Sequence, residues 1–77
     1  MMTSPSRLTG RALTDHRLLA TIDAHWRTFG IGPQYGDLTH VTGTGTSGVI
    51  YHLERLRREG FVTWEPYTPY TLRVVQP

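Results

Sequence analysis

The feature that most constrains this chain is a glycine-rich turn, Thr42–Gly45, between two segments that carry apolar residues on one side. Leu38 precedes the turn and Val49 follows it, which is the spacing of two short helices packed across a tight connection. Glycine adopts the positive φ angles that such a turn requires. We therefore expect one helix at about residues 34–41 and a second at about residues 46–59.

Apolar periodicity also predicts a longer helix upstream of the turn and two strands downstream. The upstream helix is expected at about residues 14–29, with Thr14 as its N-cap and Asp15 in its first turn. Its apolar face recurs at steps of three and four residues: Leu18, Leu19, Ile22, Trp26 and Phe29. The helix after the turn carries a buried stripe of Val49, Leu53 and Leu56, and Gly60 is expected just past its end. Alternating residues then predict strands at 61–64 and 70–75.

The length and the start of the chain restrict its organisation to one small domain. A chain of 77 residues buries only about 60% of its unfolded surface. Residues 1–12, rich in Ser, Thr, Pro and Gly, are expected to form a flexible N-terminal arm, and residues 13–77 the domain. No apolar run approaches the roughly 20 residues of a membrane span, and the first residues lack a secretory signal. We expect a cytoplasmic protein with no membrane partner.

The order of three helices followed by a hairpin is that of a winged helix-turn-helix, a mainly α fold with a small β-hairpin. The run from Asp37 to Val62 resembles the winged helix-turn-helix of bacterial regulators of the MarR and ArsR groups. The matching residues are Val49, Tyr51-His52-Leu53, Arg55-Leu56 and Glu59-Gly60-Phe61-Val62. The upstream part is similar to the N-terminal DNA-binding domain of the LexA family, and the residues that carry this likeness are Leu13-Thr14, Ile22, His25, Gly30-Ile31 and Pro33. The resemblance covers about residues 13–75 and does not extend to the self-cleaving peptidase domain of that family.

The resemblance implies a transcriptional regulator, expected to be a repressor, whose helix at 46–59 enters the major groove of double-stranded DNA. Side chains off the buried stripe are the candidate base contacts: Thr44, Thr46, Ser47, Ile50 and Tyr51. The candidate contacts to the DNA backbone are Arg27, Arg55, Arg57, Arg58, Tyr67 and Arg73.

The charge pattern departs from that family in one respect. The formal net charge is +2 and the pI is about 9.5, but no Lys or Arg lies between Thr28 and Glu54. Members of the family often carry an Arg near the position of Thr46. A monomer with so few phosphate contacts binds DNA weakly, so we expect a homodimer on a palindromic site.

A protein-interaction module on the same fold is the alternative function, either an adaptor or an antagonist of another regulator. Its basis is an uncharged aromatic surface that Tyr35, Ile50, Tyr51 and Tyr67 could form. An enzyme is not expected, because the six carboxylates are scattered and match no catalytic motif. No metal or other cofactor is expected, because there is no Cys and the four His residues lack ligand spacing on one helix face.

Overall fold

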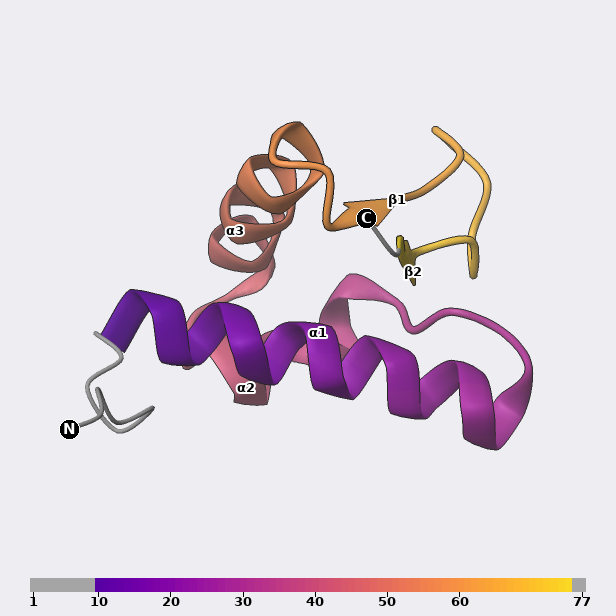
Figure 1. Cartoon of the computed structure of the whole chain (residues 1–77), viewed down its shortest axis with the longest axis horizontal. Coiled ribbons are helices and arrows are strands. Elements are labelled where there is room, and N and C mark those ends of the chain that lie inside the picture. The colour runs from indigo at the N-terminus through magenta and orange to yellow at the C-terminus, as the bar shows by residue number, and fades with distance from the viewer. Residues whose placement is uncertain (1–9, 76–77) are drawn as a thin grey trace, which may run out of the picture.

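The computed structural model describes residues 10–75. The elements are α1 (Gly10–Phe29), the 3-10 helix η2 (Tyr35–Leu38), α2 (Thr39–Thr42), α3 (Thr46–Arg58), β1 (Val62–Thr63) and β2 (Arg73–Val74) (Figure 1). The protein is therefore mainly helical with one small two-stranded antiparallel sheet, as the sequence predicts at this level. Among the described residues, no helix combines the length and the apolar character that a membrane crossing requires.

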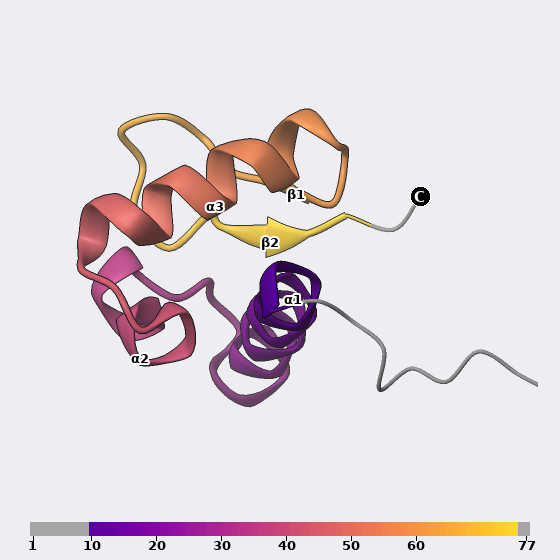
Figure 2. The same ribbon diagram turned by 90° about the vertical axis from the view of Figure 1, so that its left-hand side faces the viewer.

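The long helix α1 forms one layer, and α3 with the sheet forms the other. β2 packs on α1, β1 packs on α3, and α2 contacts both α1 and α3. Seen nearly along α1, strand β2 lies between α1 and α3 (Figure 2). In the sheet, Val62 pairs with Val74 and Thr63 pairs with Arg73.

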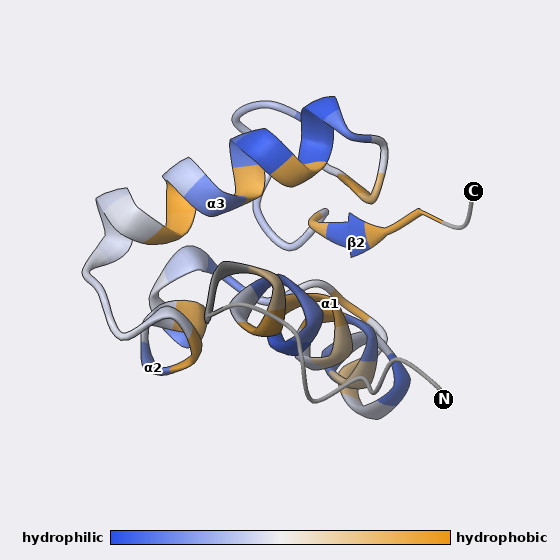
Figure 3. Ribbon diagram, turned by 60° about the vertical axis from the view of Figure 1, so that its left-hand side comes forward, coloured by the Kyte–Doolittle hydropathy of each residue, from blue (hydrophilic) through white to orange (hydrophobic). Residues whose placement is uncertain are grey.

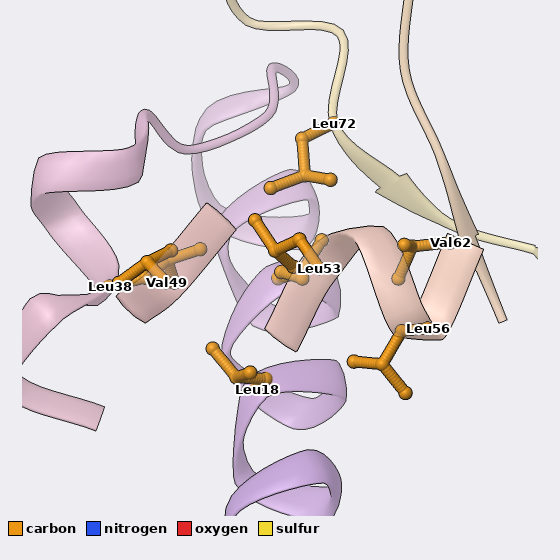
Figure 4. Close-up of a cluster of buried hydrophobic side chains, with 8 residues drawn as sticks. Leu18, Leu38, Val49, Leu53, Leu56, Val62 and Leu72 are labelled. Carbon is orange, nitrogen blue, oxygen red and sulfur yellow. The ribbon is translucent and has the colours of Figure 1, made fainter. Parts of the chain in front are cut away.

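α1, η2, α3, β1 and the residue just before β2 supply the buried side chains of a single apolar core (Figure 4). Val41 of α2 and Val74 of β2 are partly buried and pack against it. Its fully buried members are Leu18, Ile22, Leu38, Val49, Leu53, Leu56, Val62 and Leu72. The predicted stripe of α3 is confirmed, because Val49, Leu53 and Leu56 are all buried. Burying a side chain of this size contributes about 1.5–3 kcal/mol, so the core fixes how α3 is rotated about its axis.

Helix α1 differs from the sequence prediction at both ends. It begins at Gly10 rather than at Thr14, so Thr14 is not its N-cap and residues 10–12 of the expected arm are helical. The rest of that arm, residues 1–9, lies outside the described residues. At the other end the prediction of a buried Phe29 is wrong: Phe29 is 65% exposed and lies against His25, with 4.7 Å between the ring centroids. Gly30, at φ 75°, then turns the chain away.

The second predicted helix is a 3-10 turn followed by one α-helical turn, and not a continuous α-helix over 34–41. The Gln34 backbone N–H donates to the Asp37 carboxylate at 2.9 Å and closes the first turn. Of the two turn glycines, Gly43 takes the left-handed conformation at φ 71° and donates its N–H to the Thr39 carbonyl at 2.9 Å. Gly45 remains extended at φ −75° as the N-cap of α3.

The two strands are shorter than predicted because other elements occupy their hydrogen-bonding groups. The Tyr70 carbonyl accepts from the Gly32 N–H at 2.9 Å, and the Leu72 carbonyl accepts from the Trp26 indole Nε1 at 2.5 Å. A Cβ on Gly32 would collide with the Leu72 backbone, so this approach requires glycine. The carbonyls that would extend β2 therefore point toward α1 and the segment after it.

Candidate nucleic-acid interface

The burial of one stripe of α3 leaves the opposite side of the helix in solvent. Ser47, Tyr51, Glu54 and Arg58 follow one another at steps of three and four residues, and all four are exposed. We call these four residues the outer face of α3. Colouring by hydropathy shows α3 apolar toward the core and strongly hydrophilic in the C-terminal half of its other side (Figure 3). The N-terminal half of the outer face is polar and uncharged, and the C-terminal half carries charge.

The residues around the start of α3 fall into two groups. Thr46 and Ser47 are exposed in the first turn of the helix. Thr44, also exposed, has its hydroxyl 2.8 Å from the Thr42 hydroxyl and 3.2 Å from the Gly45 carbonyl that accepts from it. Its side chain also covers Gly48, where an added Cβ would collide with it. The Thr44 side chain therefore stabilises the turn, whereas the side chains of Thr46 and Ser47 are exposed to solvent.

Ile50 and Tyr51 are adjacent in sequence but differ in exposure. Ile50 is half-buried at the side of the helix, and Tyr51 is 66% exposed. The edge of the Tyr51 ring meets His52, with 5.8 Å between centroids. Tyr51 is the largest side chain of the outer face and lies between the uncharged half and the charged half.

Arg55 does not lie where a phosphate contact requires it, which corrects the sequence prediction. Its side chain is 8% exposed and packs toward α1. Its Nη1 and Nη2 donate to the two carboxylate oxygens of Asp15 at 3.0 and 2.6 Å. Glu59 lies 3.6 Å from the same guanidinium. The hydrogen bonds to Asp15 raise the pKa of Arg55 above its ordinary value, against the opposing effect of burial. Arg55 fastens α3 to α1 across 40 residues of sequence.

The remaining predicted backbone contacts are exposed but scattered. Arg57 holds its guanidinium 4.4 Å from the centre of the Trp64 ring. Arg58 has no ion-pair partner among the described residues, and Arg73 is exposed on β2. Arg27 lies on α1 and pairs with Asp23 at 2.9 Å. Tyr67 is fully exposed in the loop between the strands. Of this group, only Arg57 and Arg58 lie on α3.

From residue 12 to residue 75 the chain carries no net formal charge. Two of the eight arginines, Arg7 and Arg11, precede residue 12, and the other six equal the six carboxylates in number. The side chains described from residue 12 on are therefore balanced, and any attraction to a polyanion depends on how the charges are arranged.

Sequence reasoning missed the partners of the arginines. Asp15 is 40 residues from Arg55, and Trp64 follows the end of β1, so no local spacing reveals either contact. The position of Arg55 between Leu53 and Leu56 was the one available signal, because it places the residue beside the buried stripe. Within the described residues, no group of three or more His, Asp and Glu side chains is placed to hold a metal ion. Comparison with known proteins gave no matching family model and no matching curated sequence.

Proposed function

We propose that this chain is a winged helix-turn-helix domain that binds double-stranded DNA through the outer face of α3. The order of α1, η2 with α2, α3 and a β-hairpin supports the fold. The observation that carries the function is the exposure of Thr46, Ser47 and Tyr51 on α3. Side chains with hydroxyls on an unpartnered helix face are suited to base edges in a major groove.

The two halves of the outer face would have different tasks. The uncharged N-terminal half would read bases, with Ser47 and Tyr51 as hydrogen-bonding groups and Thr46 beside them. No side chain caps the first turn of α3, so the backbone N–H groups that precede Gly48 are available to a phosphate. Arg58, at the C-terminal end, would position the helix on the DNA backbone.

We further propose a transcriptional repressor that acts as a homodimer by occupying its site. If Arg57, Arg58 and Arg73 each neutralise one phosphate, the slope of log K against log salt is about −3 per chain. Such a slope describes weak binding by one chain. Two copies on two half-sites double the phosphate contacts and supply specificity by spacing.

Selection from a random duplex library with the full chain tests the proposal. We expect enrichment of one sequence family at about 50 mM salt and its loss at about 200 mM salt. On the selected duplex, Tyr51→Ala should change the sequence preference, whereas Arg58→Ala should weaken all duplexes alike and flatten the salt dependence. Failure to enrich any sequence at the lower salt contradicts the proposal, and equal effects of the two variants reject the assigned roles.

A protein-interaction module on the same fold is the second candidate, and the charge balance of residues 12–75 favours it. The two functions differ in their response to salt. Contacts to DNA phosphates weaken steeply as salt rises, whereas an interface centred on buried aromatic side chains depends little on salt.

A further inference from the structure

A groove with a volume of about 720 Å³ lies between α3, η2 and the loop that joins the two strands (the yellow loop at right in Figure 1). We call residues 64–72 the hairpin loop. Pockets of about 300–1,000 Å³ with mostly apolar walls and a few polar groups are typical of small-molecule sites. The outer face of α3 and this groove share only Glu54, so the groove is a separate feature of the surface.

Aromatic side chains form much of the wall. Tyr35 comes from η2, and Trp64, Tyr67 and Tyr70 come from the hairpin loop. Tyr67 and Tyr70 have φ angles of 60° and 68°, in the left-handed region that residues other than Gly, Asn and Asp rarely occupy. At Tyr67 this conformation belongs to the turn that the Thr68 N–H closes on the Glu65 carbonyl at 3.2 Å, and the turn holds the ring at the rim of the groove.

The charges in the groove favour a cation over an anion. Glu54 and Glu65 line it, and Arg57 is the single arginine there. Two carboxylates against one guanidinium repel a phosphate and attract a positive group. The chain itself already places a planar cation on the aromatic wall, because the Arg57 guanidinium lies 4.4 Å from the Trp64 ring centre.

We propose that this groove binds a planar organic cation: an aromatic ring system that carries an amidinium, guanidinium or iminium charge. The aromatic body stacks between the tyrosines of the hairpin loop and Tyr35, and the positive group faces Glu54 and Glu65. The tyrosine rings would contact the aromatic part of the ligand, and the carboxylates would contact its charge. The cation–π contact between Arg57 and Trp64 is an example of the same interaction within the chain. The proposal does not depend on DNA binding.

Ethidium, a planar fluorescent cation, is the probe, titrated into the full chain in the absence of DNA. The comparison probe is 8-anilinonaphthalene-1-sulfonate, an aromatic anion. We expect saturable one-to-one binding of ethidium, about tenfold tighter than that of the anion, from the combined cation–π and carboxylate contacts. Binding of the anion as tight as that of ethidium would overturn the proposal, because it would show an apolar surface without preference for charge. Absence of saturable ethidium binding would overturn it as well.

Matched variants locate the site. Tyr67→Gly removes one aromatic ring from the wall of the groove, and glycine adopts the φ angle of this position without strain. Glu65→Gln removes one negative charge from the groove. Each should weaken ethidium binding about three- to tenfold. The controls are Phe29→Ala, which removes an exposed aromatic ring of α1, and Asp23→Asn, which removes an exposed carboxylate of α1. Neither control should change the affinity, and a loss of equal size in a control contradicts the location.

The two indole N–H signals in an NMR titration give an independent readout. Trp64 lines the groove, whereas the Trp26 indole is hydrogen-bonded to the Leu72 carbonyl. Ethidium should shift the Trp64 signal more than the Trp26 signal, and the reverse order would overturn the placement. Because no DNA is present, failure of these tests leaves the result of the duplex selection unaffected.

Discussion

The two sides of α3 carry arginines whose environments have opposite consequences. On the side toward α1, Arg55 is buried and Asp15 accepts hydrogen bonds from both of its terminal nitrogens. On the outer face, Arg58 is exposed and has no ion-pair partner among the described residues. An arginine that pairs with a carboxylate of its own chain stabilises the fold, and an arginine without such a partner is available to an external anion. Residue type alone therefore does not assign function along this helix.

The largest effect that separates the two sides is expected in the core. Leu53→Ala should lower the free energy of unfolding by about 2–5 kcal/mol, because it removes buried methyl groups and leaves a cavity. Tyr51→Ala, two residues away and exposed, should change it by less than about 0.5 kcal/mol. Urea unfolding measures both. A similar loss in the two variants would contradict the assignment of the faces.

The two Asp–Arg pairs give the next comparison. Asp15→Ala removes both hydrogen bonds to the buried Arg55 guanidinium, leaves it only the half-exposed Glu59 at 3.6 Å, and should cost about 3 kcal/mol. Asp23→Ala breaks the exposed pair with Arg27 and should cost no more than about 1 kcal/mol. Because the pKa of Arg55 is raised, the stability from that shift is fully present at neutral pH. It is lost only as the pH rises through the pKa of Arg55. Equal unfolding free energies of the two variants at neutral pH would show that Arg55 is not held as described.

Glu54 sharpens the comparison within the outer face, because it is a carboxylate between the proposed base-reading half and Arg58. Glu54→Gln should strengthen DNA binding about three- to fivefold at ~0.1 M salt by removing a charge that repels phosphate. The same change should weaken ethidium binding to the groove. Gel shift and fluorescence titration measure the two effects. A loss of DNA affinity would mean that Glu54 itself contacts the DNA.

The smallest expected effect concerns the backbone of the hairpin loop. Tyr67→Gly relieves a left-handed φ but increases the freedom of the unfolded chain, so the free energy of unfolding should change by less than about 1 kcal/mol. Gly43→Ala places a Cβ at φ 71° and should cost about 1–2 kcal/mol. Thermal unfolding compares them. A larger loss in Tyr67→Gly than in Gly43→Ala would show that the Tyr67 ring is needed for folding.

Local sequence patterns predicted which helices and strands form and most of the core. Long-range contacts determined where α1 begins and how long the strands are. The spacing of Val49, Leu53 and Leu56 predicted α3 to within one residue of its end. The sequence placed the start of α1 too late, because an aspartate such as Asp15 is typical of a first helical turn. In the structure Asp15 lies in the second turn of α1 and accepts hydrogen bonds from Arg55. The length of the strands was overestimated, because the Gly32 N–H and the Trp26 indole N–H donate to the carbonyls of Tyr70 and Leu72 in the second predicted strand.

The candidate site was predictable only where exposure follows from the helical repeat. Ser47 and Tyr51 lie opposite the buried stripe, so their exposure follows from that stripe alone. The burial of Arg55 and the contact of Arg57 with Trp64 depend on partners from other elements. Three segments that are distant in sequence line the groove, and no motif within any one of them predicts it.

NMR of the ¹⁵N-labelled chain during titration with the selected duplex locates the DNA-binding surface residue by residue. If the outer face of α3 binds DNA, the backbone amide signals of Thr46, Ser47, Tyr51 and Arg58 shift most, whereas those around Asp23 and Phe29 on α1 remain in place. Shifts concentrated on α1, with the amides of the outer face unchanged, would contradict it.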